Sequence, residues 1–176
     1  MTVATSSTSA APVRPQLRYT LDDLLDLDAP TLQSLYEGAS VPQLGDLRGD
    51  LRGRMLTSPL GGKGLARVMR SLGGWERFPW RGKSFTPHDD ARGEGINRVF
   101  TDRNKLFKFD TFIGKSRAGA FDALQLDYDN PKNPPFIRII KDEVRTLRPG
   151  LFLGQAWIAL RGKETLALYF ALANKE

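Results

Sequence analysis

The residues best suited to acid–base chemistry gather late in the chain, within segments that are otherwise apolar. These polar candidates are Gln125, Asp127, Tyr128, Asp129, Arg138, Asp142, Glu143 and Arg145. Read with a period of two, Gln125 and Asp127 share the face of Phe121. If that face lines an apolar interior, burial raises the pKa of Asp127, which suits a general acid or base. We therefore assign candidate catalytic roles to Asp127, Tyr128 and Arg138, because an arginine can pair with the carboxylate or bind a ligand carboxylate.

The same residues have a plainer interpretation. Polar strand residues commonly face solvent, where opposite charges form cross-strand ion pairs on the outer wall. This second interpretation covers Asp142, Glu143, Arg138 and Arg145. The following stretch, 129–135, is rich in asparagine and proline, which is typical of turns. Both interpretations stay open on the sequence.

The amino-acid composition excludes thiol chemistry and leaves few kinds of residue that could bind a metal. The chain has no cysteine and a single histidine, His88. Disulfides, zinc–thiolate sites and iron–sulfur clusters are thereby excluded, and we expect neither a metal nor a cofactor. His88 precedes Asp89 and Asp90 in a polar stretch, but adjacent side chains seldom face one another, so we interpret it as a surface-loop residue. No nucleophile, base and orienting group for covalent catalysis is visible.

Aromatic and polar side chains on the expected strands are the candidates for lining a ligand site. These candidate ligand-binding residues are Trp80, Phe107, Phe109, Gln125, Arg145, Trp157 and Tyr169. The segment 75–85 mixes aromatic and basic residues, and a period of two separates Trp80, Gly82 and Ser84 from Arg81, Lys83 and Phe85. Such a mixture can stack on the bases of single-stranded nucleic acid. A barrel lining with a charged exterior is the favoured interpretation, because aromatics in all-β proteins are usually packed.

The net charge of +6 is uneven, since 19–37 carries five acidic residues and no base. The basic remainder favours acidic partners, although solvated arginines explain it as well. The chain has no apolar run long enough to cross a bilayer. The first 18 residues are rich in Ser, Thr, Ala and Pro, without the apolar centre of a secretory signal. We expect a disordered tail over 1–18, a single domain over 19–176 and a cytoplasmic protein.

Small or apolar residues alternate strictly with charged ones over 45–55, which predicts a half-buried antiparallel strand. Glycines inside such a strand indicate sharp bends or close approaches, as closure of a small barrel requires. Apolar spacing predicts two short helices over 20–27 and 28–38, placed to plug or flank a barrel end. The same reasoning predicts one helix after the first strand, over 65–72.

Short strands then follow one another, joined by turn residues. The expected strands cover 80–85, 96–100, 105–113, 121–128, 136–147, 151–160 and 164–172. The pattern predicts a mainly β protein, an antiparallel up-and-down β-barrel of seven or eight strands, because closure removes exposed edges. The last two strands are apolar on both faces. Helices or a second subunit covering the outer wall would explain this, so a homodimer stays open.

Several short motifs follow one another over 45–172. They are Gly-Asp-Leu-Arg-Gly at 49–53, Trp-Arg-Gly-Lys-Ser-Phe at 80–85, Tyr128 with Asp129, Asp142 with Arg145, Leu153 with Gly154, and Tyr-Phe-Ala-Leu at 169–172. Their order resembles that of GXWXG/DUF4334-type bacterial proteins, with Leu51 where tryptophan is expected. The first strand is also similar to that of lipocalins and other calycins. This resemblance implies a lipocalin-like β-barrel and, for the calycin relatives, binding of small apolar ligands.

Three functional classes follow. The leading one is binding of a small hydrophobic molecule, with an acidic group to match the basic charge. The second is a cofactor-free isomerase, cyclase or hydrolase that acts on such a molecule by proton transfer in the same cavity. The third, which we consider unlikely, is a nucleic-acid-binding barrel using Arg77, Trp80, Arg81 and Lys83. The direction of the face carrying Phe121 and Asp127 distinguishes a ligand cavity from a filled core with outward charges.

Overall fold

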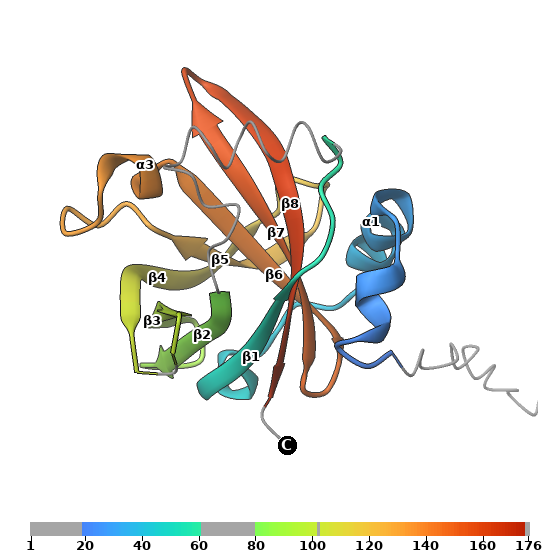
Figure 1. Ribbon diagram of the computed structural model, residues 1–176, viewed down its shortest axis with the longest axis horizontal. Coiled ribbons are helices and arrows are strands. Elements are labelled where there is room, and N and C mark those ends of the chain that lie inside the picture. Colours follow the sequence, from blue (N-terminus) through green and yellow to red (C-terminus); the bar gives the residue numbers. More distant parts are fainter. Residues whose placement is uncertain (1–18, 61–79, 102, 175–176) are drawn as a thin grey trace, which may run out of the picture.

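The computed structural model describes residues 19–60, 80–101 and 103–174. Eight antiparallel strands pair in chain order, and the last strand pairs with the first to close a barrel (Figure 1). They are β1 (Gly49–Met55), β2 (Trp80–Pro87), β3 (Arg92–Val99), β4 (Lys105–Lys115), β5 (Asp122–Asp127), β6 (Ile140–Arg148), β7 (Leu151–Leu160) and β8 (Lys163–Asn174). The predicted mainly β, up-and-down barrel is confirmed, with eight strands.

Two short helical segments lie before the barrel where the sequence predicts them. They are the 3-10 helix η1 (Asp23–Asp26) and the α-helix α1 (Ala29–Gly38). Around the start of the first, Thr20 and Asp23 form the reciprocal bonds of a capping box, in which each backbone N–H donates to the other side chain, at 2.7 and 3.2 Å. Asp28 caps α1 by accepting from the N–H of Thr31 at 2.9 Å. The helix predicted over 65–72 lies outside the described residues.

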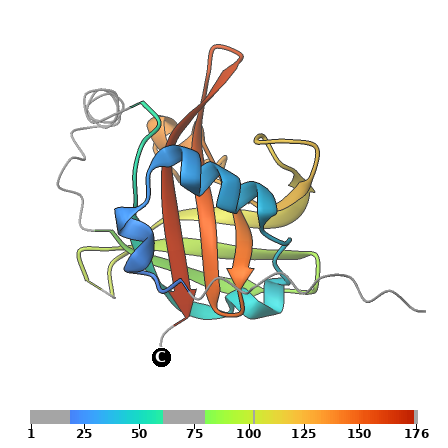
Figure 2. The ribbon, with the colours of Figure 1, turned by 90° about the vertical axis from the view of Figure 1, so that its right-hand side faces the viewer.

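These helices lie against the outer wall of the barrel and not at its end, as Figure 2 shows for the blue helices in front of β7 and β8. Leu24, Leu32 and Tyr36 are buried there against outward-facing residues of the strands, such as Leu153 and Tyr169. This packing explains why the last two strands are apolar on both faces. None of the helices in the described ranges is long and apolar enough to cross a bilayer.

Two segments differ from the prediction. Residues 45–47, expected in the first strand, belong to the 3-10 helix η2 (Leu44–Leu47). Its two leucines are three positions apart, so they fall on one side of the turn and are buried in the barrel core. Residues 136–138, expected in a strand, belong to the short helix α3 (Pro135–Arg138), where a proline at the first helical position favours the turn.

The barrel interior is filled mainly by apolar side chains. The buried members of this core are Leu44, Leu47, Leu51, Phe85, Phe109, Leu124, Leu126, Tyr128, Ile137, Val144, Phe152, Leu168, Phe170 and Leu172. Leu44 and Leu47 close the end at which β1 begins. At the opposite end, Trp80, Phe107 and Ile140 are only partly buried against the core. The interior therefore has one closed apolar end and one end that remains partly exposed.

A bulge at the start of β2 decides which side chains enter this interior. The register between β2 and β3 shifts between Trp80 and Gly82. Gly82 adopts a φ of +132°, and a Cβ there would lie 2.1 Å from the carbonyl oxygen of Leu51, so only glycine fits. The shift brings Trp80 to the same inner side as Lys83 and Phe85. The predicted grouping of Trp80 with Gly82 and Ser84 is therefore wrong, because a bulge interrupts the period of two.

Candidate functional site

A lysine lies inside the apolar barrel. β2 places Lys83 beside Leu51 of β1 and Asn97 of β3, and its side chain is only 3% exposed. The Lys83 ammonium donates to Asn97 Oδ1 at 2.9 Å, to the Tyr128 hydroxyl at 2.5 Å and to Asp142 Oδ2 at 2.9 Å. These three acceptors use all three N–H groups of the ammonium.

The acceptors are also bonded to one another. The Tyr128 hydroxyl donates to Asp142 Oδ2 at 2.9 Å, and the Asn97 amide donates to the same hydroxyl at 3.1 Å. Asn97 also donates to the Phe107 carbonyl at 3.3 Å and accepts from the Trp80 indole N–H at 3.0 Å. We call Lys83, Asn97, Tyr128 and Asp142 the interior polar cluster.

Four aromatic rings surround the lysine. The ring centroids of Trp80, Phe109, Tyr128 and Phe170 lie 5.2–5.3 Å from Lys83 Nζ. A cation this close to several rings gains cation–π attraction, which is stronger when water is excluded. β3 makes room for one of these rings through Gly95, since a Cβ there would lie 2.3 Å from the Phe109 ring. The cluster is therefore a polar site enclosed by aromatic surface.

Burial sets the protonation preferences within the cluster. It lowers the pKa of Lys83, while the charge and hydrogen bond of Asp142 act in the opposite direction. Burial raises the pKa of Tyr128 well above 10.0, and the Asp142 charge raises it further, against the hydrogen bond from Asn97. The Tyr128 phenol therefore keeps its proton at neutral pH and directs it to Asp142.

One polar atom of the cluster has no partner. Asp142 Oδ1 is buried and makes no hydrogen bond with any residue of the described ranges. The Asp142 side chain is 6% exposed, so bulk water does not solvate it freely. Native proteins leave few such atoms unsatisfied, and each costs free energy comparable to a lost hydrogen bond. This oxygen is the position in the interior at which a further molecule would gain a hydrogen bond.

The interior polar cluster lies towards the partly exposed end of the barrel. Along β2, the next inner side chain towards this end is Trp80, and along β6 it is Ile140; both are partly exposed. Ala156, opposite Asp142 on β7, is also partly exposed. The cluster is thus separated from the closed end by several apolar side chains and from the other end by a single layer.

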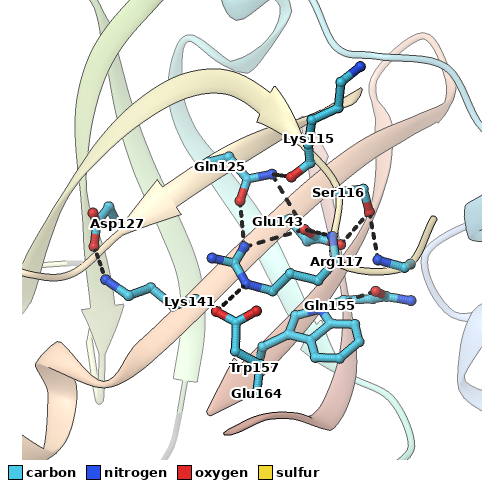
Figure 3. Close-up of polar contacts among 11 residues, drawn as sticks. Lys115, Ser116, Arg117, Gln125, Asp127, Lys141, Glu143, Gln155, Trp157 and Glu164 are labelled. Atoms are coloured by element: carbon cyan, nitrogen blue, oxygen red, sulfur yellow. Dashed lines mark hydrogen bonds and ion pairs between the residues drawn. The ribbon is translucent and has the colours of Figure 1, made fainter. Parts of the chain in front are cut away.

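The opposite face of β5 points outward, away from the core. Gln125 and Asp127 lie on this outer face, because Leu124 and Leu126 fill the interior. The Lys141 ammonium donates to Asp127 Oδ1 at 2.5 Å, and Figure 3 shows the two side chains turned towards each other. Partial burial raises the pKa of Asp127, but the Lys141 hydrogen bond, the Asp129 N–H and nearby positive charge outweigh it, so the pKa is lowered. The inward placement on which the acid–base prediction for Asp127 depends is therefore wrong. Leu124, Leu126 and Tyr128 occupy the interior instead, so this face by itself indicates a filled core with outward charges and not a ligand cavity. The charged side chains of the interior polar cluster come from β2 and β6.

The outer wall holds a second, self-contained polar network. Glu143 is fully buried and accepts from the Ser116 hydroxyl at 2.6 Å and from the Arg117 N–H at 3.0 Å. The Arg117 guanidinium reaches Gln125 at 2.6 Å and Glu164 at 3.1 Å (Figure 3). The adjoining pocket measures about 80 Å³, whereas small-molecule sites usually measure roughly 300–1,000 Å³. The polar groups of this network bond to one another and the pocket is small, so we interpret the network as stabilising the fold and not as a ligand site.

The remaining site predictions divide between the two faces. Trp80, Phe107, Phe109 and Tyr128 belong to the interior, whereas Asp127, Arg138, Gln125, Arg145, Trp157 and Tyr169 lie outside the core. Arg138 pairs with Asp129 at 2.6 Å near the surface, and the Arg145 guanidinium lies 4.1 Å from the Phe121 ring. The three candidate catalytic residues therefore do not form one site. Of the outer-wall ion pairs proposed for the late charges, Asp142 is the exception, because it points inward to Lys83.

From the sequence, Asp142 was named only among the general polar candidates and Lys83 only for a nucleic-acid surface. Neither was given a catalytic or ligand-binding role, and Asn97 was not named. A strand lysine normally faces solvent, and nothing local distinguishes this one except that it shares a face with Phe85. Lys83 and Asp142 do belong to the motifs that carry the family resemblance, and the fold brings those motifs together. Among the described residues, no group of three or more His, Asp or Glu is placed to hold a metal ion.

Comparison with solved structures supports the fold. A protein from Thermomonospora curvata is 18% identical, covers 85% of this chain and 89% of its own, and superposes with a TM-score of 0.53. An odorant-binding protein is 14% identical, with a TM-score of 0.42 over 77% of this chain and 76% of its own, a likeness too weak to support a functional argument. No family model and no curated protein matches the sequence. The GXWXG/DUF4334 likeness therefore stays a resemblance, and what the comparisons establish is the barrel fold alone.

Proposed function

We propose that the barrel binds one small, mainly apolar molecule in its interior, with the interior polar cluster contacting a polar group of that ligand. The observation that carries this proposal is the pair of charged residues, Lys83 and Asp142, buried among aromatic rings. Buried ion pairs are a weak means of stabilisation, because well-packed apolar residues often serve as well. A binding role explains why the interior holds charge at all.

The surroundings of the cluster suit such a ligand. Small-molecule sites are lined mainly by apolar and aromatic side chains with a few convergent polar groups. An eight-stranded barrel is wide enough either to fill itself with side chains or to hold one small ligand. Trp80, Phe107 and Ile140 supply apolar surface at the partly exposed end, directly beside the polar groups.

The two alternatives have less support. A proton-transfer enzyme needs a group that stabilises developing negative charge, but the N–H and O–H groups of the interior polar cluster are already bonded within the barrel. A nucleic-acid-binding surface needs exposed stacking residues, whereas Trp80 and Lys83 point inward. Ligand binding is the functional class that requires no rearrangement of the hydrogen bonds within the interior polar cluster.

The test is a titration with N-phenyl-1-naphthylamine, an apolar probe whose fluorescence rises on leaving water. We expect saturable binding with one probe per barrel. The Ala156→Trp variant fills the inner wall beside Asp142 and should weaken binding about tenfold or more, by occupying ligand space. The matched control, Ala91→Trp, changes an exposed turn at the opposite barrel end and should bind as the wild type does.

Circular dichroism establishes that both variants retain the barrel before binding is compared. Native mass spectrometry before and after organic extraction adds an independent reading, because a co-purifying apolar molecule would disappear on extraction. The proposal is abandoned if the wild type shows no saturable binding, or if folded Ala156→Trp binds the probe as tightly as the wild type.

A further inference from the structure

We infer that the group recognised by the interior polar cluster is an uncharged hydroxyl, so that the ligand is an apolar alcohol or phenol. This inference rests on the proposed binding function and identifies the ligand chemistry of the same site. It follows from which atoms of the cluster are already bonded and which one is not.

The donors of the cluster are all engaged. The three N–H groups of Lys83 donate to Asn97, Tyr128 and Asp142. The Tyr128 hydroxyl donates to Asp142, and the Asn97 amide donates to the Tyr128 hydroxyl and to the Phe107 carbonyl. A ligand that offers only acceptors, such as a ketone, an ether or a carboxylate, would have to break one of these bonds to gain another.

The charge of the cluster is already balanced. The Lys83 ammonium and the Asp142 carboxylate lie 2.9 Å apart with aromatic rings around them. Adding a carboxylate ligand would leave an unmatched negative charge where water is excluded, which is unfavourable. The acidic ligand suggested by the net charge of +6 is therefore not what the interior selects.

The open atom is an acceptor. Asp142 Oδ1 is buried without a hydrogen-bond partner in the described part of the chain. Its neighbours across the inner wall are Leu126 and Ala156, which have no side-chain donor. A hydroxyl placed against this oxygen would donate a charge-assisted hydrogen bond, which is stronger than one between neutral groups. An uncharged hydroxyl also preserves the charge balance of the cluster.

The experiment compares three molecules of one skeleton by displacement of N-phenyl-1-naphthylamine from the wild-type protein at neutral pH. They are 2-naphthol, which donates a hydrogen bond, 2-methoxynaphthalene, which does not, and 2-naphthoate, which is an anion. We expect 2-naphthol to bind about tenfold or more tightly than either of the other two, as expected for one hydrogen bond to a charged acceptor.

A variant supplies the second arm. Ala156→Ser places a hydroxyl opposite Asp142, where it can donate to Oδ1 within the protein. The preference for 2-naphthol over its methyl ether should then fall towards unity, because the serine hydroxyl takes the place of the ligand hydroxyl at Oδ1. This variant leaves Lys83 and Asp142 in place, so it avoids the folding risk of removing either charge.

Each outcome has a defined meaning. Equal affinity for 2-naphthol and the ether, or tightest binding of 2-naphthoate, overturns the hydroxyl inference while the binding function stands. An unchanged preference in folded Ala156→Ser likewise places the hydroxyl elsewhere and overturns it. If none of the three molecules binds or displaces the probe, the proposed function fails together with the inference.

Discussion

Lys83 Nζ and Asp142 Oδ2 lie 2.9 Å apart, although 59 positions separate the two residues. The lysine comes from β2 and the carboxylate from β6, strands that are not neighbours in the barrel. Their side chains meet across the interior because β8 pairs with β1 and closes the sheet. The contact is thus a product of barrel closure and not of strand pairing.

The first prediction concerns the energetics of this pair. Lys83→Met leaves the Asp142 carboxylate buried without its cation, which should lower the free energy of unfolding by about 3–5 kcal/mol. Adding Asp142→Leu removes the stranded charge and should recover most of that loss. Urea denaturation of the two single variants and the double variant measures the coupling.

The matched control is an exposed ion pair. Lys108 and Glu94 lie 3.0 Å apart with side chains 47% and 36% exposed. Lys108→Met should lower the unfolding free energy by less than about 1 kcal/mol, because solvent screens such pairs. A loss in the double variant equal to the sum of the two single-variant losses would show that the two charges are not energetically coupled.

The second prediction concerns alkaline pH. Burial raises the pKa of Tyr36 above its ordinary value of 10.0, and the nearby Glu143 carboxylate raises it further. Above pH 10 the unfolded chain loses the Tyr36 proton and the folded chain keeps it, so the unfolded state binds fewer protons. Stability must then fall as pH rises, with Tyr36 contributing up to about 1.4 kcal/mol per pH unit.

Tyr36→Phe removes that contribution. Urea denaturation from about pH 9 to about pH 11 should show a shallower decline of stability for the variant than for the wild type. Subtracting the two curves cancels the other titrating groups, including Lys83 and Tyr128. Parallel curves would mean that the Tyr36 phenol ionises equally easily in the folded and unfolded chains.

The third prediction concerns the close approach of an aromatic ring to the backbone. A Cβ at Gly95 would lie 2.3 Å from the Phe109 ring, so Gly95→Ala should lower the unfolding free energy by about 1–3 kcal/mol. Gly45→Ala is the control, because a Cβ there meets nothing within 4 Å. Phe109→Leu should cost less in the Gly95→Ala background than alone. Additive effects would argue against contact between residues 95 and 109.

The fourth prediction compares two adjacent leucines of η1. Leu24 is fully buried against the outer wall, whereas Leu25 is 45% exposed. Leu24→Ala should lower the unfolding free energy by about 2–5 kcal/mol, and Leu25→Ala by less than about 1 kcal/mol. Thermal or urea denaturation measures both. Similar losses at the two positions would contradict the packing of η1 on β7 and β8.

The local pattern of the sequence was enough to predict most of the helices and strands and their order along the chain. Alternation separated Leu124, Leu126 and Tyr128 from the opposite face of β5, and that separation is confirmed. The reciprocal Thr20–Asp23 bonds could be predicted because the two residues are three positions apart. Turn residues between short strands predicted the meander, and the need to protect sheet edges predicted closure. These features depend on neighbours along the chain.

The tertiary structure alone decided which face of each strand points inward. The outer wall under α1 is also apolar, so the composition of a strand did not reveal its direction, and Asp127 was expected inside for this reason. The bulge at Gly82 then moved Trp80 to the inner side, against the period of two. Lys83 and Asp142 became a buried pair only when the sheet closed, because their contact joins strands far apart in sequence. A periodic pattern records that a strand has two faces, whereas burial depends on what the rest of the chain places against each.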